Sequence, residues 1–234
     1  MFTQSADVGL NHLLRDLPEA EQTHLLEHLV KVDLHFGEVL CNADQVYTKV
    51  YFPLTGMISL VASVDEEAPL ELGMIGSEGM LGATLLLAVD ESPLRAVVQA
   101  DGVAMSLPAS VLKQLIVDCP VFTLRLKRYL YVLMHQLNHS TACTHFHQVN
   151  ERLVRWLLMA HDRTPANNLM LTQQFLADML GVQRSAISIA AGALQERELI
   201  SYSRGEIKVL NREGLEAASC GCYSVIAKKA ADIA

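Results

Sequence analysis

The chain has 234 residues, of which 51% are hydrophobic and 19% are charged. This composition excludes a disordered or fibrous protein, and the length allows one or two domains with a sizeable core. The formal net charge of -8 argues against a protein that coats nucleic acid or an anionic membrane through overall positive charge.

The charge is unevenly distributed along the chain. Residues 1–162 carry 10 basic and 19 acidic residues, whereas residues 163–234 carry 8 and 7. This asymmetry predicts two parts with different roles. We expect no signal peptide, and the longest apolar run, Met80–Val89, is too short to span a membrane. Five cysteines without paired spacing favour a cytoplasmic protein with reduced thiols.

The first half of the chain predicts one helix followed by short strands. Leucines at helical spacing predict a helix over 8–30 with a break at Pro18. Turn residues, including an acidic turn at Asp65–Ala68, then separate runs rich in β-branched and aromatic residues. The expected strands are 31–36, 38–41, 48–53, 56–64, 70–76, 94–100 and 102–107. This succession predicts an antiparallel β-roll or sandwich.

A helical region follows the strands. Pro108 fits the first turn of a helix over 109–118, and Pro120 opens a long helix. Apolar residues recur along that long helix every three or four positions, a stripe that favours packing on a partner. The stripe comprises Phe122, Leu126, Tyr129, Leu130, Leu133 and Leu137. A further helix is expected over 149–161, and residues 163–169 are expected to form a loop.

The last 65 residues have a pattern of their own. Thr172 can cap a helix over 173–180, and Gly181 provides the positive φ that the following turn needs. A second helix is expected over 183–196, and a strand, a tight turn and a strand over 199–210. A helix–turn–helix followed by a β-hairpin is the winged arrangement of a DNA-binding domain. An ordinary helical hairpin within a core is the alternative.

The N-terminal end of the second helix is the part expected to enter a major groove. The stretch from Gly181 to Gln195 contains one arginine and no acidic residue, although the protein as a whole is acidic. Arginine can donate two hydrogen bonds to guanine, and serine can reach base edges or phosphates. The predicted DNA-binding residues are Thr172, Gln173, Gln183, Arg184, Ser185 and Ser188, with Arg204 and Lys208 of the hairpin holding phosphates.

Together these motifs resemble the Crp/Fnr family of bacterial transcription regulators over nearly the whole chain. The resemblance is most specific at 171–210, where Leu-Thr-Gln-Gln, Leu-Ala-Asp-Met-Leu-Gly-Val, Arg-Ser-Ala-Ile-Ser and Leu-Ile-Ser-Tyr fall in register. It implies an α+β fold: a cyclic-nucleotide-binding-like β-roll with flanking helices over 1–119, a dimerisation helix over 120–148 and a winged helix-turn-helix domain over 149–234. It also implies a homodimer that binds a palindromic double-stranded DNA operator and contacts RNA polymerase, and we expect no enzymatic activity.

The recognition helix departs from the pattern of the cyclic-AMP-responsive members. Those members carry an Arg-Glu and a further Arg, where this chain has Arg184, Ser185 and Ile189. We therefore expect a different operator sequence.

The phosphate-binding motif departs as well. Cyclic-AMP-binding members have Gly-Glu-Leu and a downstream Arg, whereas this chain has Gly82-Ala83-Thr84, with Arg95 one place out of register. Strand alternation then turns Arg95 to the other face, which disfavours cyclic AMP. We predict no cofactor. Gly79, Gly82 and Arg95 stay candidates for the border of an effector pocket, with turn glycines and a surface arginine as the alternative.

One helical stripe offers metal-ligand side chains at a spacing of four: His135, His139, Cys143 and His147. These residue types suit zinc, haem iron or copper. The alternative function is therefore a metal- or haem-dependent sensor that acts mainly through protein contacts. Histidines at ordinary interface or surface positions would explain the stripe equally.

Three other constellations are weaker. His145, His147 and Glu151 have the spacing of a cupin metal enzyme, but the segment lacks glycine and is expected to be helical. No cysteine precedes Cys41, which disfavours the iron–sulfur cluster of the oxygen-sensing branch. Cys220 and Cys222 are close enough to form a redox or metal pair, or a structural pair.

Overall fold

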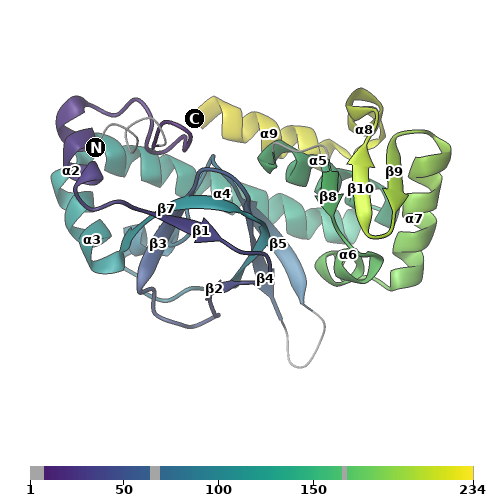
Figure 1. Ribbon diagram of the computed structural model, residues 1–234, viewed down its shortest axis with the longest axis horizontal. Coiled ribbons are helices and arrows are strands. Elements are labelled where there is room, and N and C mark those ends of the chain that lie inside the picture. Colours follow the sequence, from purple (N-terminus) through teal and green to yellow (C-terminus); the bar gives the residue numbers. More distant parts are fainter. Residues whose placement is uncertain (1–7, 64–68, 165–167, 234) are drawn as a thin grey trace.

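The computed structural model describes residues 8–63, 69–164 and 168–233 of the chain. Strands of the N-terminal half form an antiparallel roll, a long helix runs along one side of it, and the C-terminal helices and hairpin lie beyond its end (Figure 1). This arrangement confirms the predicted α+β fold. The acidic turn predicted at Asp65–Ala68 lies outside the described residues.

All seven predicted strands of the roll are present. In chain order the N-terminal elements are α2 Glu19–Leu26, β1 Val30–Leu34, β2 Val39–Cys41, β3 Lys49–Pro53, β4 Met57–Ala62, β5 Leu70–Ile75, the 3-10 helix η1 Ala83–Leu87, β6 Arg95–Ala100 and β7 Gly102–Pro108. One sheet has the strand order β1-β7-β3 and the other β2-β6-β4-β5. Buried side chains such as Phe52, Ile58 and Met105 fill the core of the roll.

The helix predicted over 8–30 is wrong in extent, because residues 9–18 form turns and an irregular segment before the helix Glu19–Leu26 begins. The buried Asn11 explains the difference. Its amide nitrogen donates hydrogen bonds to the backbone oxygens of Pro53 (2.8 Å) and Gly79 (3.0 Å), and its side-chain oxygen accepts one from Leu13 (3.0 Å). Asparagine side chains compete in this way with helical backbone bonding. The segment before α2 is therefore a set of turns anchored to the roll.

Two helices follow the roll, α3 Ala109–Asp118 and α4 Pro120–Phe146. Most of the apolar stripe on α4 packs on the roll of the same chain, because Phe122, Leu126, Tyr129 and Leu133 belong to its buried core. The expectation that this stripe faces a partner is therefore wrong. A different face of α4 is exposed, and it carries the apolar residues Leu124, Tyr131 and Met134.

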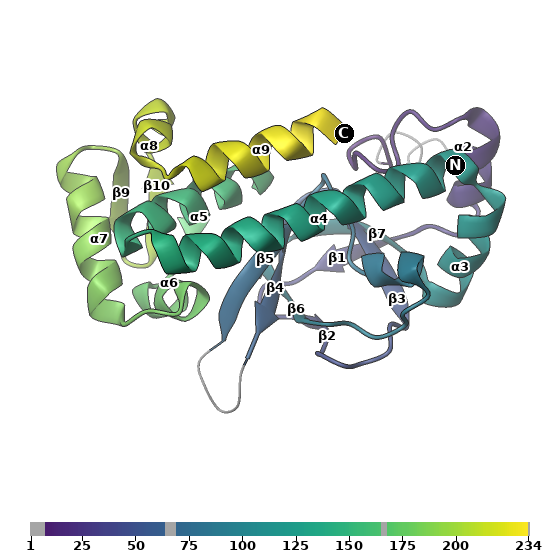
Figure 2. The ribbon, with the colours of Figure 1, turned by 180° about the vertical axis from the view of Figure 1, so that it is seen from behind.

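The C-terminal half consists of α5 Val149–Arg163, β8 Asn168–Met170, α6 Gln173–Leu180, α7 Arg184–Glu196, β9 Ile200–Ser203, β10 Glu206–Val209, α8 Arg212–Ala218 and α9 Gly221–Ile233. Strand β8 replaces part of the loop predicted at 163–169, because its backbone pairs with β10 in the order β8-β10-β9. Residues 165–167 of that loop lie outside the described residues. Helix α9 returns along α4 (Figure 2). Within the described residues, we find no helix that is both long and apolar enough to cross a membrane.

Candidate nucleic-acid interface

The turn between α6 and α7 has the geometry that the sequence predicts. The Thr172 hydroxyl accepts a hydrogen bond from the backbone N–H of Phe175 (3.1 Å) and so caps α6. Gly181 ends α6 with φ +60°, a left-handed conformation that costs residues with a Cβ atom more than it costs glycine. A Cβ atom there would also lie 3.0 Å from the Leu70 side chain of the roll. Gly181 therefore serves both the turn and the close approach of the roll.

Helix α7 has one buried face and one exposed face. Its buried face packs in the core through Ile187, Ala190, Ala191 and Leu194. Arg184, Ser185 and Ser188 are exposed at the N-terminal part of the helix, and Gln183, also exposed, precedes it. The Ser188 hydroxyl donates a hydrogen bond to the side-chain oxygen of Gln173 on α6 (2.6 Å). This bond links the exposed polar faces of α6 and α7.

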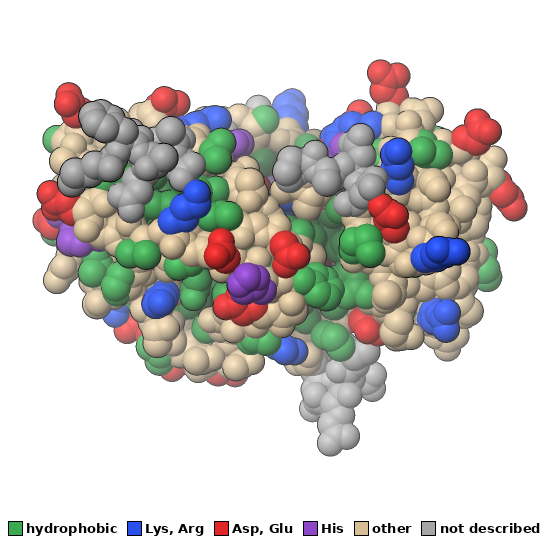
Figure 3. Space-filling model, viewed as in Figure 1, with side chains coloured by type: hydrophobic (Ala, Val, Ile, Leu, Met, Phe, Trp, Pro, Cys, Tyr) green, Lys and Arg blue, Asp and Glu red, His purple; other side chains and the backbone are tan. Residues whose placement is uncertain are grey.

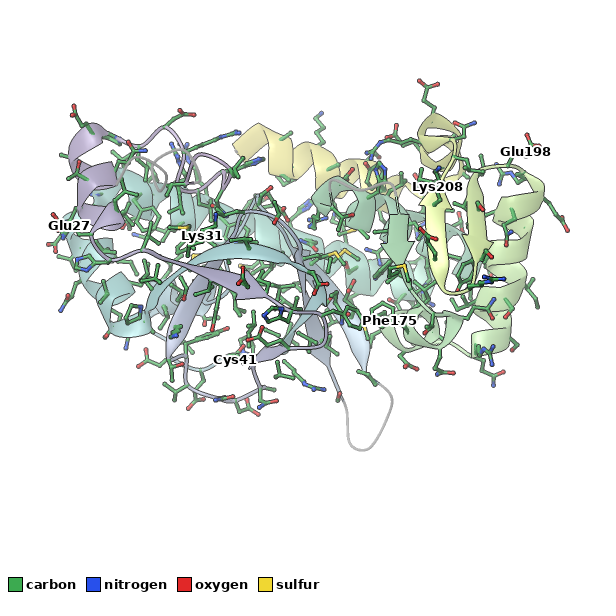
Figure 4. All side chains as sticks on the ribbon, viewed as in Figure 1. Glu27, Lys31, Cys41, Phe175, Glu198 and Lys208 are labelled. Atoms are coloured by element: carbon green, nitrogen blue, oxygen red, sulfur yellow. The ribbon has the colours of Figure 1, made fainter. Side chains whose placement is uncertain are left out.

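A polar groove of about 390 Å³ lies between the start of α6, the start of α7 and the hairpin. Its lining residues are Thr172, Gln173, Gln174, Arg184, Tyr202, Ser203, Arg204 and Gly205. The structure thus brings together four of the predicted DNA-binding residues from three elements. Gln183, Ser185 and Ser188 lie on or beside α7 but do not line the groove. Lys208 lies outside it on β10, where its side chain is exposed (Figure 4).

The groove also contains residues that the sequence analysis missed. Gln174 and Ser203 line it, and so does Tyr202, whose hydroxyl donates to the backbone oxygen of Leu171 (2.9 Å). Ile189 of α7 was noted only for its departure from a family pattern, yet its side chain is 73% exposed. An apolar side chain on the polar face of a helix is the signal that could have identified it. Basic and acidic side chains are both present on this half of the molecule (Figure 3).

The first helix of the motif packs against the roll. The Phe175 ring lies between Phe36 of the roll and Trp156 of α5, at centroid distances of 6.2 Å and 6.1 Å (Figure 4). Hydrophobic side chains also line the surface between the two halves (Figure 3), including Met57 and Leu169. Phe175 of α6 thus contacts both the roll and α5.

Comparison with known proteins gives a family match to the C-terminal part of the chain and structural matches to most of the chain. Residues 151–218 match the Crp-like helix-turn-helix domain. A protein assigned to the Crp/Fnr family from Eubacterium rectale has a similar structure, with a TM-score of 0.69 and 18% identity over 90% of this chain and 98% of that chain. The chain has the Crp/Fnr regulator fold, with a helix-turn-helix DNA-binding domain.

Two further solved structures share the Crp/Fnr regulator fold. The c-di-GMP responsive global regulator CLP of Xanthomonas campestris has a TM-score of 0.66 and 18% identity over 82% of this chain and 99% of that chain. FixK2 of Bradyrhizobium japonicum has a TM-score of 0.66 and 16% identity over 82% of this chain and 98% of that chain. No curated protein matches the sequence. At these identities the structural likeness establishes the fold, and the DNA-binding domain rests on the sequence match.

In this Crp/Fnr fold an apolar cavity of about 200 Å³ lies between the roll and α4. Among the described residues that line it, none has a charged side chain. Gly82 lines it, but Gly79 and Arg95 do not. Gly79 instead packs on Tyr129, whose ring atoms would lie 2.4 Å from an added Cβ atom, and Arg95 is exposed at the start of β6. The Arg95 guanidinium is thus not placed to neutralise a ligand in the cavity.

The predicted metal-ligand stripe on α4 is divided in the structure. The rings of His135 and His139 contact each other at a tilt of 43°, with their centroids 4.4 Å apart. Cys143 and His147 instead meet the cysteines of the C-terminal segment, and we name Cys143, His147, Cys220 and Cys222 the hinge cluster. The structure thus places two residues of the predicted stripe, Cys143 and His147, next to the separately predicted pair Cys220 and Cys222.

The thiols of the hinge cluster are reduced and interact. None of the five cysteines of the chain, all of which are described, forms a disulfide. Hydrogen bonding between Cys143 and Cys220 lowers the pKa of Cys220 and raises the pKa of Cys143. Glu151, of the predicted cupin pattern, instead accepts a hydrogen bond from the backbone of Gln148 (3.0 Å) at the start of α5.

Proposed function

We propose that this chain is a homodimeric, sequence-specific DNA-binding transcription regulator that acts in the cytoplasm and contacts RNA polymerase. The observation that carries the proposal is the polar groove that Thr172, Gln173, Arg184 and Arg204 line together. Two of these residues are cations, and the groove lies between the start of α7 and the hairpin. In winged DNA-binding domains these are the two elements that meet base edges and backbone phosphates.

Within this interface, helix 183–195 is proposed to read the bases. Arg184 is suited to a guanine, which offers two acceptors in the major groove. Ser185 and Ser188 are suited to base edges or phosphates, and the exposed Ile189 to a thymine methyl group. Arg204, Lys208 and the Thr172–Gln173 end of α6 would hold phosphates and fix the register.

We propose that α4 forms the dimer contact through its exposed face. Leu124, Tyr131 and Met134 follow one another there at intervals of seven and three residues, which is the spacing of a coiled-coil seam. Two recognition helices about 34 Å apart would then select an inverted repeat. The corresponding division is a sensor roll over 1–119, a dimerisation helix over 120–148 and a DNA-binding domain over 149–234.

The cavity between the roll and α4 is proposed to hold the effector. Its lining is mainly apolar. The Tyr47 hydroxyl already donates its hydrogen bond to the Ser92 hydroxyl (2.7 Å). Burying a phosphate there without a cationic partner would be costly. We therefore infer an uncharged, mainly apolar small molecule in place of cyclic AMP. CLP, by contrast, is a c-di-GMP responsive regulator.

Selection of bound DNA from a random pool, with and without cell extract, tests the proposal. We expect the selected sequences to contain an inverted repeat. If DNA binding requires an effector, the repeat should be enriched only in the presence of extract, and otherwise it should be enriched under both conditions. Affinity for the selected site should fall steeply with salt, because bound phosphates release counterions. A metal- or haem-dependent sensor that acts mainly through protein contacts would enrich no sequence and show no steep salt dependence.

A further inference from the structure

The hinge cluster joins two segments that are far apart in the sequence. Cys143 lies in the last turn of α4, and His147 immediately follows that helix. Cys220 precedes α9, and Cys222 lies in its first turn. The cluster therefore ties the end of the long helix, where the chain enters the DNA-binding half, to the helix that returns along α4 (Figure 2).

The four side chains are arranged like ligands around a single ion. The Sγ atoms of Cys143 and Cys220 are 3.5 Å apart, and the Sγ atom of Cys222 lies 3.8 Å from Nδ1 of His147. All four potential ligand atoms lie within 4.8 Å of one another. In a tetrahedral zinc site with Zn–S bonds of about 2.3 Å, ligand sulfurs lie about 3.8 Å apart.

We propose that the hinge cluster is a structural Zn²⁺ site with three cysteine ligands and one histidine ligand. Three soft thiolates and an imidazole in tetrahedral array select zinc over the hard cations, which prefer oxygen. The site is closed, because four protein ligands fill the coordination sphere and both Cys143 and Cys220 are buried. Zinc would displace the remaining thiol protons to solvent.

A buried arginine next to the cluster supports this assignment independently. Zn²⁺ with three thiolates has a net charge of about -1. Arg155 is 5% exposed and has an Nε atom without a hydrogen-bond partner. Among the described residues its positive charge acts on both the buried Glu71 and Cys143 of the cluster. Its Nη1 atom donates to the hydroxyl of Ser140 (3.2 Å), one turn before Cys143 on α4. The guanidinium therefore stands beside the negative charge that the zinc-bound cluster would carry.

A zinc ion at this place would fix how the DNA-binding half leaves α4. The chain passes from α4 to α5 at His147 and Gln148, so one ligand lies at the junction itself. Removal of the ion would free the start of α9 from the end of α4. We therefore expect metal removal to loosen the junction and lower operator affinity while the roll keeps its fold.

Metal analysis of the reduced, full-length chain tests the site. After incubation with Zn²⁺ and removal of excess, we expect about one zinc ion per chain, and Co²⁺ in its place should give the visible spectrum of a tetrahedral thiolate site. Cys220→Ser and Cys143→Ser should lose the ion. Cys41→Ser, a change in the roll (Figure 4), should retain it. His28→Ala controls for binding at the separate group of His24, Glu27 and His28 at the end of α2.

A measurement on the unaltered protein covers the case in which the serine variants fail to fold. Zinc should protect Cys143, Cys220 and Cys222 from alkylation and leave the reactivity of Cys41, which belongs to neither candidate metal group, unchanged. A reduced chain that retains no zinc, equal protection of all five cysteines, or a Cys143–Cys220 disulfide that forms in place of metal binding would overturn the proposal. None of these results bears on operator selection, so a failed zinc site and a failed regulator function are distinguishable.

Discussion

Replacing the buried Glu71 by glutamine should stabilise the protein at neutral and higher pH. Glu71 lies on β5, and its carboxylate accepts a hydrogen bond from the Ser59 hydroxyl. Burial raises the pKa of Glu71 from 4.5 to about 7, although Ser59 and the Arg155 guanidinium act in the opposite direction. The folded protein therefore holds a proton that the unfolded chain releases between these two values.

The sign and size of the effect follow from this pKa difference. Because the raised pKa favours the protonated form in the folded state, stability is greatest below pH 4.5 and falls as the pH rises toward 7. At about 1.4 kcal/mol for each pH unit, the total loss is about 3 kcal/mol. Glu71→Gln removes the ionisation. At pH 8 the variant should therefore be more stable than the wild type by up to about 3 kcal/mol, and at pH 4.5 the two proteins should have similar free energies of unfolding.

Urea unfolding of both proteins at several pH values measures the difference directly. The contributions of groups that do not interact with Glu71 cancel in the comparison, and Glu91→Gln provides a matched change at an exposed glutamate. Parallel stability curves for the wild type and Glu71→Gln between pH 5 and 8, or a less stable variant at pH 8, would refute the reasoning.

Three further changes test local parts of the structure. Gly181→Ala should lower the free energy of unfolding by about 1–2 kcal/mol, because φ is positive there and Leu70 is close; an unchanged urea midpoint would contradict this. Thr172→Ala should cost about 1 kcal/mol through the lost cap of α6, whereas Thr172→Ser should keep it, and equal losses would exclude the cap as the cause. Tyr131→Glu should shift the dimer to monomer in sedimentation, while Val117→Glu, an exposed site on α3, should not; a dimeric Tyr131→Glu would exclude this face.

Local sequence patterns predict the roll and the helix-turn-helix well. Most strands of the roll begin or end next to glycine, proline or aspartate, and the Thr172 cap and the Gly181 turn depend on local residues. The helix prediction for residues 8–30 is wrong because the side chain of Asn11 forms hydrogen bonds with residues as distant in sequence as Gly79. Such long-range anchoring has no periodic signal in the segment itself.

The long helix shows a second limit of sequence patterns. An apolar stripe such as that of Phe122 and Leu126 has the same spacing whether it packs on a partner or on the roll of its own chain. The hinge cluster shows a third. Cys143 and Cys220 are 77 residues apart, and the return of α9 along α4, which brings them together, was not predicted. Spacing alone grouped Cys143 with His135 and His139 instead.

The measurement that most directly tests DNA reading by α7 compares the base preferences of the wild type and Arg184→Ala on the selected operator. If Arg184 contacts a guanine in each half-site, Arg184→Ala should lose about 1–3 kcal/mol per half-site and relax the preference at one base. Arg204→Ala, a change at the hairpin, should weaken binding to all sequences alike and reduce the salt slope by about 1. Unchanged discrimination by Arg184→Ala at every position of the operator would contradict the account.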